Sequence, residues 1–258
     1  MVEQVLERLL TGNVYAFMLV FARIGAAFTL LPGFADAYVP VRARLLLALA
    51  ISVVVVPVVA GELPPMPASA LALGLLVIGE SVTGFFLGSI SRVLLGALDV
   101  AGMIVSMQTG LAAAMIFNPA LATQGTLVGV LLTNLGIVLM FVTDLHHLLI
   151  LAVVGSYEIF VPGTGLPLAD FGQTVVGLVA RSFAVGAQMA APFLIVGIMF
   201  NVGLGVLQKL MPQIQIFFVA MSTQIALGLL MLMITLSAAM MFWLGHLEAV
   251  LIGLAGRG

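Results

Sequence analysis

The chain has 258 residues, of which 63% are hydrophobic and 7% are charged, whereas roughly 25% of the residues of a soluble globular protein are charged. No soluble fold of this length has enough interior to bury so much apolar surface, so the chain must lie in a membrane or inside a protein assembly. The formal charge of −2 excludes a basic surface for nucleic acid, and the absence of cysteine excludes disulfides and thiolate metal sites.

Apolar stretches separated by short connections predict an all-α, integral-membrane-type protein, because backbone groups in an apolar medium must be satisfied within each segment. A helix needs about 20 apolar residues to cross a hydrocarbon core of roughly 30 Å. The stretch 68–98 would reach about 46 Å at 1.5 Å per residue, whereas 148–160 is too short to cross alone. Such unequal lengths favour helices that pack against other protein. In chain order the stretches are 13–31, 45–60, 68–98, 100–117, 126–141, 148–160, 174–210 and 214–244.

Proline and glycine mark the connections between these stretches. A short polar connection, 31–40, follows the first stretch, 63–67 is a rigid proline-rich linker, and 161–167 is the longest joint. We expect the last two helices, roughly 192–244, to form a long antiparallel hairpin. The residues expected at its tip are Gln208, Lys209, Gln213 and Gln215.

Six ionisable residues lie within the apolar stretches or at their edges. A charge inside a membrane-like segment is costly unless it is paired, so each is a candidate functional residue. We interpret them mainly as fixed ion pairs that set helix register, since a proton pathway would need several acids along one face. Arg92 and Asp99, seven residues apart, would lie on one face of an unbroken helix. The six residues are Arg23, Glu80, Arg92, Asp99, Asp144 and Arg181.

The densest polar cluster is Asp144-Leu145-His146-His147. Its spacing is not that of a zinc-binding helix, and the chain has no HExxH motif. We therefore interpret it as a turn between two helices, in which the imidazoles cap carbonyl groups. The sequence also lacks a Gly-x-Ser-x-Gly nucleophile elbow and a phosphate-binding glycine loop. We accordingly expect no catalytic, cofactor-binding or metal-binding residue.

Small residues recur at helix-packing distance. Three residues separate Gly84 from Gly88, and likewise Gly125 from Gly129, a spacing that lets two helix backbones approach closely. Together with the 28 glycines of the chain, these pairs favour a tightly packed helical assembly.

The most unusual stretch, 108–125, is apolar at its centre, bounded by Gly110 and Gly125, and broken by Asn118-Pro119. The proline pushes Asn118 away from helical backbone angles. A non-helical segment at membrane depth must be buried in protein or line a cavity, and a narrow apolar constriction can close a pore by expelling water. From the residues alone, such a seal and an ordinary interhelical bend are equally good interpretations.

Many short motifs, taken in order, extend over most of the chain. They occupy residues 22–25, 31–34, 39–49, 79–80 with 84 and 88, 108–111, 146–147, 156–157 before 161–162, 191–192, 201, 204–205 and 212–217. In this order and spacing the chain resembles the FliR/SctT family of type III export apparatus proteins. No single motif is decisive, but the order and spacing make the likeness specific.

The resemblance implies a non-enzymatic subunit of the flagellar type III export gate, which forms and seals the channel for unfolded flagellar proteins. It implies a FliP-like part, 1–185, fused to a FliQ-like hairpin, 186–258, inside a cone-shaped hetero-oligomer. The implied partners are FliP, FliQ, FlhB and FlhA homologues together with membrane lipid, and the implied location is the basal body in the bacterial inner membrane. No cofactor and no nucleic acid are expected.

The resemblance also places a channel plug on residues 108–124. Gly110 and Gly125 would act as hinges of this loop. The family usually has Asp before the plug proline, whereas this chain has Asn118; this puts in doubt any role that needs a charge there, although a dewetted seal needs none. The residues expected to form the seal are Leu111, Met115, Ile116, Phe117, Asn118 and Pro119.

Three alternatives stay open at this point. Flagellar and injectisome members share these motifs, and general similarity favours the flagellar system. A small-solute or ion transporter would use Glu80, Arg92, Asp99 and Asp144, although the chain shows no inverted repeat. An intramembrane metalloenzyme would be built on Asp144 with His146 and His147.

Overall fold

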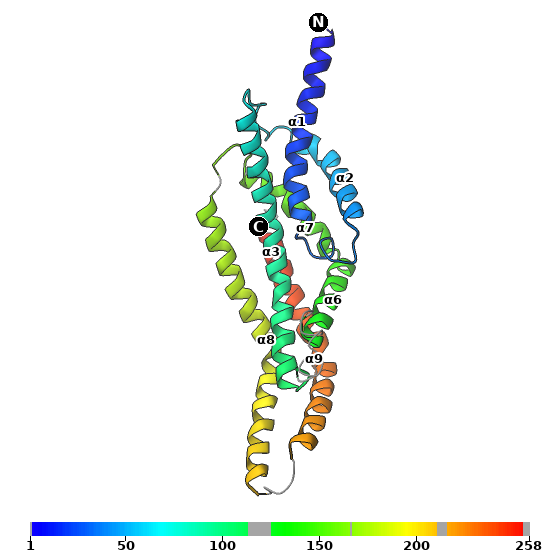
Figure 1. Cartoon of the computed structure of the whole chain (residues 1–258), viewed down its shortest axis with the longest axis vertical. Helices are drawn as coiled ribbons and strands as arrows, with labels where there is room; N and C mark the ends of the chain where they lie inside the picture. The colour runs from blue at the N-terminus through cyan, green and yellow to red at the C-terminus, as the bar shows by residue number, and fades with distance from the viewer. Residues whose placement is uncertain (1, 113–124, 166, 211–215, 255–258) are drawn as a thin grey trace. The chain divides into compact units, whose positions relative to one another are not determined.

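The computed structural model describes the backbone of residues 2–112, 125–165, 167–210 and 216–254. Within these ranges every regular element is an α-helix and none is a strand, which confirms the predicted all-α fold (Figure 1). The helices are α1 (Val2–Phe28), α2 (Val41–Val59), α3 (Ala70–Gln108), α6 (Leu127–Val142), α7 (Leu145–Ile159), α8 (Leu168–Leu210) and α9 (Ile216–Leu254).

Local chemistry explains several helix boundaries. The hydroxyl of Thr126 accepts a hydrogen bond from the Gly129 N–H at 3.1 Å, so α6 begins with an ordinary side-chain cap. α2 begins directly after Pro40. α8 continues through Pro192, so the arms of the predicted hairpin are longer than 192–244.

A single helix, α3, replaces the two stretches predicted as 68–98 and 100–117. The helix is therefore unbroken at Asp99, whose exposed carboxylate accepts a hydrogen bond from Thr133 at 2.8 Å. Because the Asp99 side chain bonds to Thr133, it does not compete for the hydrogen bonds of the helix backbone.

The described chain forms two compact units that alternate along the sequence. The first comprises residues 1–93, 144–178 and 248–258, and the second comprises 94–143 and 179–247. The predicted division into 1–185 and 186–258 is a different matter, since it concerns likeness to two other proteins, and it stays a prediction.

In the first unit, α1 packs along α2 and against the first part of α3. A Cβ atom on Gly84 would overlap the carbonyl oxygen of Arg23, and one on Gly88 would lie 2.8 Å from that of Ala27. The Gly84-x-x-x-Gly88 spacing is therefore confirmed as a close-packing motif. The contact moves four residues forward on both helices, from Arg23 to Ala27 and from Gly84 to Gly88, so α1 and α3 run in the same direction.

In the second unit, Trp243 of α9 is buried at the centre and donates its indole N–H to the Leu94 carbonyl at 3.0 Å. α6 approaches α3 where Gly129 lies against Gly102. Gly125, the other half of the second predicted glycine pair, lies before α6 with φ 90° and makes no close contact with another helix.

The long arms of α8 and α9 run antiparallel, as predicted. Residues 193–200 face 224–231 across one small cavity, and 188–192 face 235–242 across another. Earlier residues of α8 thus face later residues of α9, so the two helices run in opposite directions.

Four described helices, α2, α3, α8 and α9 from Ala220, are long and apolar enough to cross a membrane. α6 and α7 are bent by 78° at their junction and together make a fifth, broken span or a re-entrant loop. Large apolar side chains lie exposed along these helices; on α2, for example, Val54 is 69% and Val58 71% exposed. Such a surface requires lipid or other subunits around it.

Candidate functional site

The predicted plug lies between α3, which ends at Gln108, and α6, which begins at Leu127, so Gly110 and Gly125 lie just outside these two helices. Both glycines have a left-handed backbone, with φ 75° and 90°, a conformation that glycine adopts without steric cost. Their role as hinges of a moving loop stays a prediction.

Of the six residues predicted to form the seal, the structure describes Leu111, which is half-buried. At the predicted hairpin tip, Gln208 and Lys209 are exposed at the end of α8. The remaining residues lie outside the described ones: Met115, Ile116, Phe117, Asn118, Pro119, Gln213 and Gln215.

The α8–α9 hairpin holds Gln108, which ends α3, and the two turn residues after it; we call these residues (Gln108–Gly110) the plug root. The Gln224 side chain on α9 donates to the Gln108 carbonyl at 2.7 Å. Cβ atoms on Gly197 and Gly228 would overlap the side chains of Gln108 and Thr109. The hairpin therefore touches the root from both of its helices.

Sequence reasoning missed Gly197, Gln224 and Gly228. Single glycines are frequent in long apolar helices, and Gln224 lies 116 residues from its partner. The sequence offers no local signal for either feature.

A second polar site lies in the first unit, where Arg23 of α1 and Glu80 of α3 form a bidentate ion pair. Arg23 donates from Nε to Glu80 Oε2 at 2.7 Å and from Nη2 to Oε1 at 3.0 Å. It also donates to Ser156 Oγ at 3.0 Å and to the Phe160 carbonyl at 2.7 Å, and it lies 3.8 Å over the Tyr157 ring. One guanidinium therefore joins α1, α3 and the end of α7.

The Arg23 and Glu80 side chains are 1% and 4% exposed. Buried charges are tolerated only when they are paired and their remaining donors are satisfied, and here the donors of Arg23 reach a carboxylate, a hydroxyl and a carbonyl. Such a contact fixes the register of three helices.

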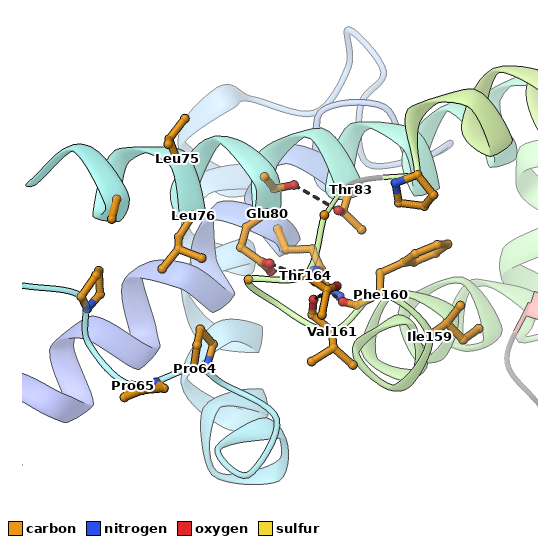
Figure 2. A pocket seen from close by; sticks show the side chains of 17 residues that line it. Pro64, Pro65, Leu75, Leu76, Glu80, Thr83, Ile159, Phe160, Val161 and Thr164 are labelled. Atoms are coloured by element: carbon orange, nitrogen blue, oxygen red, sulfur yellow. Dashed lines mark hydrogen bonds and ion pairs between the residues drawn. The ribbon is translucent and has the colours of Figure 1, made fainter. Parts of the chain in front are cut away.

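A cavity of about 650 Å³ lies beside this ion pair. It is bounded by α3, the proline-rich linker 64–67 and the connection 159–165. In Figure 2, Glu80 lies between α3 and the side chains of Pro64 and Val161. Because both Glu80 oxygens accept bonds from Arg23, the carboxylate that lines the cavity acts as an ion-pair partner, not as a free base.

Comparison with known proteins identifies the family. The sequence model of a family described as bacterial export proteins, family 1, matches residues 14–250. The chain belongs to this family. The flagellar biosynthetic protein FliR of Caulobacter vibrioides is 40% identical over 231 residues, which cover 90% of this chain and 92% of that protein.

Other members of this export family are more distant but match at similar length. FliR of Bacillus subtilis is 27% identical over 86% of both chains. The Yop proteins translocation protein T of Yersinia pestis is 29% identical over 84% of both chains. The chain is thus a subunit of a type III export apparatus and a multi-pass protein of the bacterial inner membrane.

Arg92 and Asp99 of this export protein have separate partners. Arg92 does not bind Asp99; its Nη1 donates to Asp36 at 3.0 Å, with half of its side chain exposed. Seven residues separate Arg92 and Asp99 by about 10 Å along the helix axis, so sharing a face does not bring them into contact. Arg181 on α8 is exposed.

Asp36 lies in the connection between α1 and α2, where it has three donors. Its carboxylate accepts from the Gly33 N–H at 2.8 Å, from the Tyr38 hydroxyl at 3.2 Å and from Arg92. Burial alone would raise the pKa of Asp36, but the hydrogen bonds and the charge of Arg92 outweigh burial and hold that pKa below its ordinary value.

The Asp144 cluster forms the predicted turn, since it lies at the bend between α6 and α7. Asp144 has a left-handed backbone with φ 59°, and His147 Nδ1 lies 3.5 Å from its carboxylate. Possible ligand atoms of Asp144, His146 and His147 all lie within 4.8 Å of one another. The turn thus brings three metal-ligating groups closer than their spacing suggested, with Asp144 and His147 exposed.

Proposed function

We propose that this chain is a non-enzymatic channel subunit of the flagellar type III export gate, in which residues 108–124 close the channel for unfolded flagellar proteins. The observation that carries the proposal is the plug root. Gly110 and Gly125, both with a left-handed backbone, lie near the two ends of the segment. The α8–α9 hairpin contacts the plug root through Gln224, Gly197 and Gly228. A seal needs such an anchored base if its apolar centre is to occupy a fixed place in a pore.

The buried ion pair supports a structural role in place of transport chemistry. Glu80 is fully engaged by Arg23, and Asp99 accepts from Thr133. Glu80 is buried and Asp99 is exposed, so these two acids do not line one path. Ion transport requires acids arranged along a continuous path.

The proposed partners are FliP, FliQ, FlhB and FlhA homologues, assembled into a cone to which this chain contributes a FliP-like part and a FliQ-like hairpin. The large apolar surfaces exposed on α2, α8 and α9 support an assembly of this kind, because a single chain leaves them uncovered. The flagellar system is favoured over the injectisome because the Caulobacter FliR is 40% identical and the Yersinia protein 29%.

Deletion of residues 112–120 tests the proposal. In cells that express the gate without a filament, we expect the deletion to let small solutes leak while FliP-like and FliQ-like subunits still co-purify. An unchanged leak in a correctly assembled gate would remove the plug assignment. Restoration of swimming in a flagellar-gate null strain, but not of secretion in an injectisome null strain, tests the choice of system.

A further inference from the structure

An open apolar groove of about 500 Å³ lies in the first unit between α1, α2 and α3. Its walls come from residues 18–29, 41–48 and 77–85. The nearest atoms to a Cβ built on Gly25 belong to the Phe21 ring at 3.6 Å, which is ordinary van der Waals contact. Small residues on α1 therefore leave a real vacancy along the helix.

The length of this groove along α1 is close to the thickness of one leaflet of a bilayer. Residues 18–29 of α1 extend about 16 Å at 1.5 Å per residue, and half of a hydrocarbon core is about 15 Å. α2, which forms the second wall, is itself long and apolar enough to cross a membrane. One acyl chain lying along α1 would thus match the groove in length.

Only one end of the groove carries positive charge. α1 ends at Phe28 and α2 begins at Val41, and because the two helices pack along each other these ends lie together (Figure 1). Arg44 lies at this end and lines the groove, and the exposed Arg42 is two residues away. The rest of the lining is apolar apart from hydroxyl groups on Thr29 and Ser81.

Arg44 keeps donors free for a ligand. Its Nε donates to the Phe34 carbonyl at 2.8 Å and its Nη2 to the Asp36 carbonyl at 3.3 Å. A guanidinium has five N–H groups, so three remain. Within the described residues, the nearby Asp36 carboxylate is already bound by Arg92, and neither Arg42 nor Arg44 is in an ion pair.

We infer that this groove binds an anionic phospholipid, with one acyl chain between α1, α2 and α3, the phosphate on Arg44, and the exposed Arg42 adding positive charge at the same end. Guanidinium groups match phosphate oxygens in geometry and charge, and the apolar walls match the chain. The occupant would fasten the N-terminal end of α2 to α1. This inference is independent of the plug, since none of these residues belongs to the plug root.

The test uses the full chain purified with its co-purifying gate subunits and re-equilibrated with phosphatidylglycerol or phosphatidylcholine, followed by native mass spectrometry. We expect phosphatidylglycerol to be retained in preference. Arg42→Gln should weaken its binding about fivefold, the equivalent of about 1 kcal/mol for one basic residue near an anionic group. Arg42 is the better target than Arg44, because Arg44 also holds the connection before α2.

A second variant tests the contribution of the apolar groove to lipid binding independently of the arginine charges. Gly25→Leu fills the groove and should reduce retention of both lipids, whereas Gly96→Leu, at a site with no atom within 4 Å of a Cβ, should leave it unchanged. Equal phosphatidylglycerol retention in wild type, Arg42→Gln and Gly25→Leu would overturn the inference. So would a photoreactive residue at Leu45 that cross-links to a sister subunit instead of to lipid.

Discussion

At the scale of single residues, the ion pair between Arg23 and Glu80 dominates the first unit. Arg23 has four partner groups, the Glu80 carboxylate on α3 and the Ser156 hydroxyl, the Tyr157 ring and the Phe160 carbonyl at the end of α7. Both members of the pair are buried. Removal of one member leaves the other charged and buried, which is far more costly than loss of an exposed ion pair.

Replacement of Glu80 by Leu should therefore destabilise the chain by about 3–5 kcal/mol, because it leaves the buried Arg23 guanidinium without its ion-pair partner. Replacement of both residues by apolar ones, Arg23→Met with Glu80→Leu, should recover much of that loss. Arg92→Met, which breaks the half-exposed pair with Asp36, is the matched control and should cost within about 1 kcal/mol. Unfolding of the purified protein in detergent measures all three, and equal stability of Glu80→Leu and wild type would contradict the role of the pair.

Asp36 makes a pH-dependent contribution to stability. Since its pKa in the folded protein lies below the ordinary value of 3.8, its stabilisation is fully present above that value and is lost as the pH falls through the folded-state pKa. The advantage of wild type over Asp36→Asn should thus be constant near neutral pH and shrink below about pH 4. Stability measured for both proteins from pH 7 to pH 3 checks this, and a constant difference throughout would refute it.

At the scale of elements, the contact between the plug root and the α8–α9 hairpin depends on two glycines. A side chain at Gly228 would overlap Thr109, and one at Gly197 would overlap Gln108. The end of α3 can approach the hairpin this closely only because both positions lack a Cβ.

Gly228→Val should displace the plug root and raise the leak of small solutes through the assembled gate. Gly203→Val and Gly205→Val, on α8 at positions with open space around them, should leave the leak at the wild-type level. Thr109→Gly combined with Gly228→Val should reduce the leak again, because it removes the overlapping side chain. A closed gate in the Gly228→Val protein, with normal assembly, would show that the root contact does not position the plug.

Elements that depend on local chemistry were predictable from the sequence. The glycine spacing at Gly84 and Gly88 indicated a close contact between helices, without naming α1 as the partner, and the polar run at Asp144 indicated the turn before α7. Partners far apart in sequence were not predictable: Glu80 lies 57 residues from Arg23. The spacing of Arg92 and Asp99 indicated a shared helix face, but helix periodicity says nothing about the partner of Arg92, which is Asp36 on a distant connection.

At the scale of the whole molecule, the chain exposes apolar helices that a single copy cannot cover, and it belongs to a family of bacterial export proteins. The central claim is that residues 108–124 lie in the path of the exported protein. The absence of cysteine makes this directly testable, since any introduced cysteine is the sole thiol of the chain.

The most direct measurement is cross-linking of a single cysteine to an export substrate stalled in the assembled gate. Phe117→Cys should form a cross-link to the stalled chain, while Val58→Cys, on the exposed apolar side of α2, should not. A stalled substrate that forms no cross-link to Phe117→Cys, or that cross-links equally to Val58→Cys, would contradict the claim.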